Sequence, residues 1–167
     1  MPVENGIIFL RSSQPTACIA ISDSGGNRTF SVLAFPNATV YWYVFGRATA
    51  KSDFGLNVYD ASGAIVFSSD HLPMNVQSMY STSSAPITGA SITVPSGNWA
   101  FCFSDPGVIM WSSGTGGGTV TNAEYWCHAL SGTTLSIQPL KTRTLDTYIR
   151  DAYFQPKAIV MIDVTHA

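Results

Sequence analysis

The chain has 167 residues and a formal net charge of −2; only 11% of its residues are charged, while 46% are hydrophobic. Ordinary soluble domains carry about 25% charged residues, so hydroxyl groups or other subunits are expected to cover this surface. Nucleic-acid binding needs clustered Lys and Arg, and the acidic balance argues against it. No apolar window of about 18 residues exists, so no membrane insertion is expected.

A single domain is expected over residues 1–167, because a chain of this length buries an extensive core without disulfides or metals. Segments 1–16 and 140–167 are candidates for extended or subunit-bridging arms. The scarcity of charge favours an obligate homo-oligomer or a docked subunit; the alternative is a monomeric β domain rich in Ser and Thr. The first residues lack the basic and apolar regions of a secretory signal, so we expect retention in the cytoplasm until assembly.

Runs of β-branched and aromatic residues, separated by turn signals, predict strands along the whole chain. In the first half the expected elements are strands at 7–10, 17–21, 29–35 and 40–45, and a hairpin over 55–67. In the second half they are an irregular strand at 76–80 and strands at 91–94, 99–103, 108–111, 123–130, 133–137 and 158–164. Residues 144–152 are the one place for a helical turn.

Turn signals define how these strands connect. Residues 23–27 form a turn, and Pro36-Asn37 favours a tight reversal. The turn at 95–98 predicts a hairpin over 91–103, and Ser131-Gly132 predicts another over 123–137. The glycine-rich segment 112–118 is expected to be a flexible loop, since ordering so many glycines in a helix or central strand is costly.

About ten short antiparallel strands, with turns every eight to twelve residues, predict an all-β fold with little or no helix. The pattern is typical of a β-sandwich, either jelly-roll-like or immunoglobulin-like. Strand order within the sheets is not readable from the sequence.

The three cysteines, Cys18, Cys102 and Cys127, are an odd number with no Cys-x-x-Cys spacing. Their wide separation in the sequence therefore does not indicate a metal or redox motif. We expect reduced thiols that pack as small hydrophobic side chains. A disulfide between Cys102 and Cys127 is the alternative, and cytoplasmic assembly argues against it.

The hairpin over 55–67 carries the clearest folding signal of the chain. Asp60 favours a turn, and Gly63 supplies a residue that tolerates positive φ. Its sequence, Gly-Leu-Asn-Val-Tyr-Asp-Ala-Ser-Gly followed after one residue by Ile-Val-Phe-Ser-Ser, resembles a hairpin of small tail proteins of tailed bacteriophages. The resemblance covers about a tenth of the chain. It departs from the family pattern where Ser68 and Ser69 replace the usual acidic residue.

The resemblance implies a structural virion protein of a tailed phage, located at the tail tip or baseplate. Such a protein acts by assembly with other phage tail proteins, and tail symmetry implies a homo-oligomer, either a trimer or a hexamer. Its location would be the virion, assembled in the cytoplasm of the bacterial host. The alternatives are a host-attachment module that recognises a glycan or pilus receptor, and a capsid decoration protein.

No catalytic or metal site is expected. Cys127 and His128 are neighbours on a predicted strand, so their side chains point to opposite faces and cannot easily share an ion. The chain lacks a Gly-x-Ser-x-Gly elbow, and its glycine run lacks the Lys-Ser/Thr of a phosphate-binding loop. We therefore expect a protein that is not an enzyme and has no cofactor.

Exposed aromatic residues and the glycine loop are the candidates for recognition or subunit contact, because Trp and Tyr stack on sugars and anchor interfaces. Strand alternation places Trp42 opposite its two tyrosine neighbours, and Tyr125 opposite Trp126. Packing of these rings in the sandwich and in oligomer contacts is the alternative. The candidate recognition or interface residues are Trp42, Trp111, Gly116, Gly117 and Tyr125.

Overall fold

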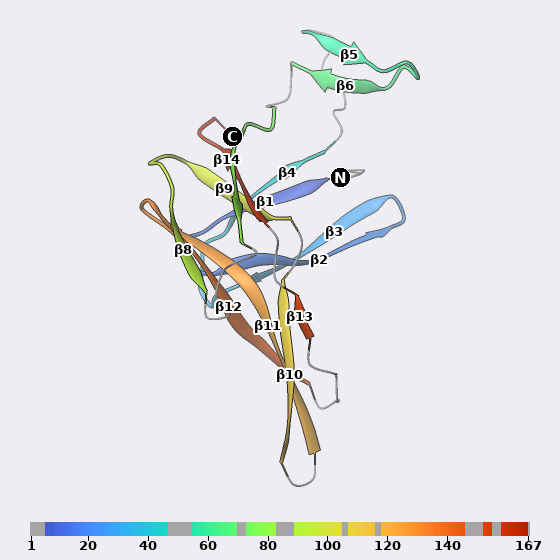
Figure 1. Cartoon of the computed structure of the whole chain (residues 1–167). Helices are drawn as coiled ribbons and strands as arrows, with labels where there is room; N and C mark the ends of the chain where they lie inside the picture. The colour runs from blue at the N-terminus through green and yellow to red at the C-terminus, as the bar shows by residue number, and fades with distance from the viewer. Residues whose placement is uncertain are drawn as a thin grey trace.

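The computed structural model describes residues 6–46, 55–69, 73–82, 89–104, 107–115, 118–145, 152–154 and 158–166. Within these ranges the chain forms fourteen strands and no helix (Figure 1). Every strand pair is antiparallel. The all-β prediction is therefore confirmed, with more strands than the ten expected.

The first sheet has five strands, and two of its three inner strands lie close to the ends of the described chain. Its order is β4 (Tyr41–Phe45), β1 (Ile7–Arg11), β9 (Trp99–Phe103), β14 (Ala158–Asp163) and β7 (Val76–Ser81). Strands β4 and β7 are therefore its two edges.

The second sheet is organised around the longest strand, β11. The main path of this sheet is β13 (Ala152–Phe154), β10 (Val108–Thr115), β11 (Gly118–Ser131), β12 (Thr134–Leu145) and β8 (Ala90–Thr93). Strand β2 (Thr16–Ser24) joins β11 at the pair Thr16 and His128, and β3 (Asn27–Ala34) pairs with β2. The remaining two strands, β5 (Asn57–Tyr59) and β6 (Ile65–Ser68), form a hairpin that lies apart from both sheets (Figure 1).

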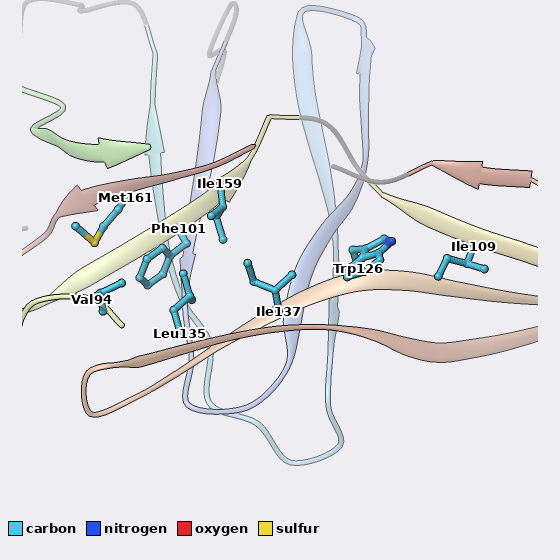
Figure 2. Packing of buried hydrophobic residues seen from close by; sticks show 8 residues of the cluster. All are labelled: Val94, Phe101, Ile109, Trp126, Leu135, Ile137, Ile159 and Met161. Carbon is cyan, nitrogen blue, oxygen red and sulfur yellow. The ribbon is translucent and has the colours of Figure 1, made fainter. Parts of the chain in front are cut away.

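The main hydrophobic core lies between the two sheets, as expected for a β-sandwich (Figure 2). Apolar residues alternate along each strand, so one face of each sheet supplies the core. The buried members are Val94, Phe101, Ile109, Trp126, Leu135, Ile137, Ile159 and Met161. A second cluster, on the opposite face of the first sheet, contains Phe9, Ala100, Ile162 and Val164.

Two predicted hairpins are confirmed. Strands β11 and β12 are joined through Gly132, which has a φ of 58°. In the β5–β6 hairpin the N–H of Gly63 donates to the carbonyl of Asp60 at 3.0 Å, and Gly63 has a φ of 80°. The Asp60 carboxylate accepts hydrogen bonds from the backbone N–H groups of Ser62 and Ala64. This turn therefore forms as the sequence predicts, with Asp60 as the turn-forming residue and Gly63 at positive φ.

The predicted hairpin over 91–103 is wrong. Strand β8 pairs with β12 in the second sheet, whereas β9 pairs with β1 and β14 in the first. The turn at 95–98 therefore carries the chain from one sheet to the other, as does the turn at Asn37, whose φ is 62°. Two alternating runs joined by a short turn can either pair edge to edge or pack face to face, and local sequence does not distinguish these outcomes.

The glycine-rich segment also differs from the prediction. Residues 112–115 continue strand β10, and Gly118 begins β11. Among the described residues they form a two-stranded ribbon, since the last pair between β12 and β11 on this side is Thr121 and Leu145. Cross-strand hydrogen bonds offset the entropy that these glycines lose. The helical turn expected at 144–152 is contradicted at both ends, where 144–145 belong to β12 and Ala152 begins β13; residues 146–151 lie outside the described ranges.

Candidate functional site

The predicted recognition residues fall on different sheets. Trp42 lies on the edge strand β4 and is 67% exposed, opposite Leu10 of β1. Tyr125 lies on β11, is partly buried, and pairs with Val108 and Leu140. The backbone of Trp111 lies on β10 opposite Asn122, and its side chain is not among those described. Trp42 thus lies in the five-stranded sheet, whereas Trp111 and Tyr125 lie in the seven-stranded sheet.

Gly116 and Gly117 lie outside the described residues. The strands on either side of them, β10 and β11, end at the pair Thr115 and Gly118. The predicted loop tip therefore has no structural description, and its candidacy as a recognition element stays a prediction.

Four large apolar side chains of the β5–β6 hairpin and the residue before it are exposed. Leu56 is 63% exposed, Val58 43%, Tyr59 57% and Val66 53%. Its single charged residue within 55–69 is Asp60, at the turn. Exposed apolar side chains gathered on one hairpin make it a candidate interaction site.

A cavity of about 400 Å³ lies where β1 and β9 diverge. These strands are joined at the pair Leu10 and Phe101. Beyond this pair, Ile8 and Phe103 line the cavity from its two sides. The floor of the cavity is formed by its buried lining residues, which are at most 5% exposed. They are Ile8, Phe9, Leu10, Phe101 and His128. The cavity volume falls in the range of pockets that bind small molecules or side chains.

The mouth of the cavity is also apolar. Ile7, Ile21 and Met74 line it and are between 41% and 50% exposed. Arg28 is the charged residue of the lining; its Nε donates to Asp23 Oδ1 at 2.7 Å, and one terminal nitrogen donates to the Gly6 carbonyl at 3.0 Å. The guanidinium of Arg28 lowers the pKa of the Asp23 carboxyl group.

His128 lines the same cavity and is fully buried. Its Nε2 lies 3.3 Å from the Leu10 carbonyl, which can only accept, so Nε2 carries the proton. The ring meets Phe101 and Phe103 edge-on, with centroids 5.7 and 5.4 Å apart. Burial lowers the pKa of His128 to about 4, although the bond to the Leu10 carbonyl opposes this. The side chain is therefore neutral at pH 7, and its buried Nδ1 has no hydrogen-bond partner in the part of the chain that the structure describes.

All three cysteines are free thiols, and Cys18 and Cys102 both line the cavity. Burial raises the pKa of Cys102 to about 12, with a further contribution from Cys18, and burial also raises the pKa of Cys18. Burial raises the pKa of Cys127 to about 12. Because the thiolate is the reactive form, these thiols are weak nucleophiles at neutral pH.

The arrangement supports binding more directly than it supports chemistry. The cavity brings together apolar side chains, one neutral imidazole and two protonated thiols, without an activated nucleophile beside a base. In the described ranges no group of three His, Cys, Asp or Glu side chains could hold a metal ion.

Sequence reasoning missed the cavity. Its walls come from β1, β2, β3, β9, β11, β14 and the segment before β7, which are distant in sequence. The one available signal was the placement of His128 on the face opposite Cys127. That alternation places His128 on the same face as the buried Trp126, but nothing in the local sequence indicated a cavity there.

The fold and these surfaces define an all-β, sandwich-like protein with an apolar cavity and an exposed apolar hairpin. Comparison with protein-family models, curated proteins and solved structures found no match. Across the described residues, no helix has the length and apolar character needed to cross a membrane.

Proposed function

We propose that this chain is a structural virion protein of a tailed bacteriophage, a tail-tip or baseplate component that acts by protein–protein assembly. The observation that carries the proposal is the β5–β6 hairpin. It is the segment that resembles a hairpin of small phage tail proteins, and its Leu56, Val58, Tyr59 and Val66 side chains are exposed. A hairpin that presents apolar side chains to solvent in one copy is suited to burial against another protein.

The edges of the five-stranded sheet support an assembly function as well. Strand β4 has the sequence Tyr-Trp-Tyr-Val-Phe, with no charge, proline or glycine. Tyr41 and Trp42 on it are exposed, as are Val76 and Met79 on the other edge strand, β7. Edge strands of proteins that remain monomeric usually carry lysine, proline or bulges, which prevent pairing with the strands of another chain. The unprotected edge of β4 therefore favours a protein whose edges are covered in its assembled state.

The direct test is whether the chain is part of the phage particle. Particles purified from lysates of the phage that encodes it would be analysed by quantitative mass spectrometry and by immunogold electron microscopy. We expect a fixed small number of copies per particle, with label at the tail tip. Label on the capsid would instead identify a decoration protein, and absence from particles despite abundance in the lysate would contradict a virion role.

The hairpin should be required for self-association. We expect the double variant Leu56→Ser, Val58→Ser to raise the protein concentration needed for oligomer formation by about tenfold or more, since each lost apolar contact weakens association by about 1 kcal/mol or more. Sedimentation velocity over a dilution series measures this. Circular dichroism would verify that the β-sheet content is unchanged.

The matched control is Phe35→Ser, which removes an apolar side chain that is 44% exposed outside the hairpin. This control should leave self-association close to that of the unmodified chain. An equal effect of the two changes would show that the hairpin has no special part in assembly.

A further inference from the structure

We propose that the cavity lined by β1 and β9 is a binding site for a small, uncharged apolar molecule, such as an aromatic hydrocarbon. Such a site is independent of the proposed assembly function, because it lies within one copy of the chain. Three features of the cavity support it: its shape, the state of the polar groups in its lining, and the side chains at its mouth.

The cavity has the shape and size of a small-molecule site. Its floor is at most 5% exposed, whereas Ile7, Ile21 and Met74 at its mouth are 41–50% exposed. Its volume of about 400 Å³ lies within the range of about 300–1,000 Å³ for ligand pockets. A dry apolar cavity of about 150 Å³ already accommodates benzene. The cavity therefore has room for a molecule larger than a single aromatic ring.

The charged residue of the described lining, Arg28, is already paired within the chain. Its Nε and one terminal nitrogen donate to the two carboxylate oxygens of Asp23, and the other terminal nitrogen donates to the Gly6 carbonyl. An anionic ligand would have to compete with the Asp23 carboxylate, and a cationic ligand would meet no carboxylate in the described lining. Burying an unpaired charge is strongly unfavourable, so the lining selects an uncharged molecule.

The other polar side chains of the described lining are hydrogen-bonded to the backbone. They are Cys18, Cys102, Ser104 and His128. The second ring nitrogen of His128, which has no partner in the described ranges, is itself buried. A polar ligand would exchange its hydrogen bonds to water for few in the cavity, which is costly. The lining therefore disfavours polar ligands as well as charged ones.

Apolar side chains continue from the cavity onto the surface. Ile7, Ile21 and Met74 come from β1, β2 and the segment before β7, and they gather around one opening. Water is a poor occupant, since a buried water needs two to four polar partners. An apolar molecule that fills the cavity as far as this mouth removes apolar surface from water and supplies the dispersion contacts that an empty cavity lacks.

Naphthalene and two charged analogues test the chemical class. Equilibrium dialysis of the full chain against naphthalene, naphthalenesulfonate and naphthylmethylammonium measures affinity and stoichiometry. We expect saturable binding of one naphthalene per chain, and at least about tenfold weaker binding of both ions, because the cavity offers them no free counter-charge. Absence of saturable naphthalene binding, or equal affinity for either ion, would overturn the proposal.

A matched pair of variants tests the location. Cys18→Phe places a large side chain in the cavity, whereas Val32→Phe places the same side chain on the residue that pairs with Cys18. Val32 is 41% exposed and does not line the cavity. We expect naphthalene affinity to fall by at least about tenfold in Cys18→Phe and to stay within about twofold in Val32→Phe. Circular dichroism verifies the fold of both, and equal losses would contradict binding in the cavity.

Alkylation of the native Cys18 thiol gives a readout that needs no change in the cavity. Saturating naphthalene should slow its labelling by iodoacetamide by at least about fivefold, because the reagent must reach the thiolate. Labelling of a thiol introduced by Val66→Cys, on the β5–β6 hairpin, should not change. Unchanged labelling of Cys18 would place naphthalene elsewhere and overturn the site. Naphthalene binding that disappears as the chain associates at higher concentration would show that a second copy fills the cavity, and would overturn it too.

Discussion

Replacing Phe101 with alanine is expected to lower the free energy of unfolding by about 3–5 kcal/mol. Phe101 is 0% exposed and belongs to the core between the sheets, where it also packs edge-on against His128. Its removal would extend the existing cavity, which Phe101 lines, into the core. Small domains are stable by about 5–15 kcal/mol, so this single change removes a large part of the total.

Urea denaturation followed by intrinsic fluorescence and by circular dichroism measures the loss. The control Phe35→Ala truncates the same side chain type at a partly exposed position and should cost less than about 1 kcal/mol. If Phe101→Ala does not fold, Phe101→Leu, which keeps most of the volume, provides the intermediate value. Equal losses at positions 101 and 35 would contradict the assignment of the core.

Acidification from pH 7 to pH 4 is expected to remove on the order of 3 kcal/mol of stability through His128 alone, because each pKa unit corresponds to about 1.4 kcal/mol. The pKa of this buried group is lowered from 6.5 to about 4 in the folded chain. Between these values the unfolded chain binds a proton that the folded chain does not. The stability is therefore fully present above pH 6.5, is lost as the pH falls toward 4, and changes no further below it.

The variant His128→Gln isolates this contribution, since glutamine does not titrate. Its stability should change little across the window, whereas that of the unmodified chain should fall steeply. Asp23 and Asp163 have a lowered pKa from their hydrogen-bonded partners Arg28 and Thr165, so their stabilisation is lost mainly below this window. Parallel pH profiles for the two proteins, measured by urea denaturation, would show that His128 is not buried in its neutral form.

Local signals predicted local structure well. Strand β9 was expected at 99–103 and lies at Trp99–Phe103, since alternation of large apolar residues identifies a half-buried strand directly. The turn of the β5–β6 hairpin followed from Asp60 and Gly63 in the same way. In both cases the residues that determine the structure are neighbours in the chain.

Pairing between sheets could not be predicted in this way. The turn at 95–98 was read as a hairpin, but β8 and β9 belong to different sheets, and β9 instead pairs with β14, nearly sixty residues further along. That choice depends on which apolar faces must be buried together, a property of the whole fold. The cavity has the same origin, because its lining comes from strands that are distant in sequence.

The recognition residues were predicted only as candidates, because exposure of an aromatic ring depends on strand order. Trp42 is exposed because β4 is an edge strand. Trp126, with similar sequence surroundings, is buried in the core. Exposed aliphatic residues of the hairpin were missed as a surface because alternation alone predicts one buried face, whereas this hairpin lies apart from both sheets.

Whether further copies cover the exposed apolar surfaces is measured most directly by the absolute mass of the purified chain in solution. Size-exclusion chromatography with light scattering would be run at two protein concentrations that differ by about tenfold, enough to shift a weak equilibrium visibly. We expect the same trimer or hexamer at both concentrations. A mass of 17.9 kDa at both, which is that of a single chain, would contradict assembly through the hairpin and the sheet edges.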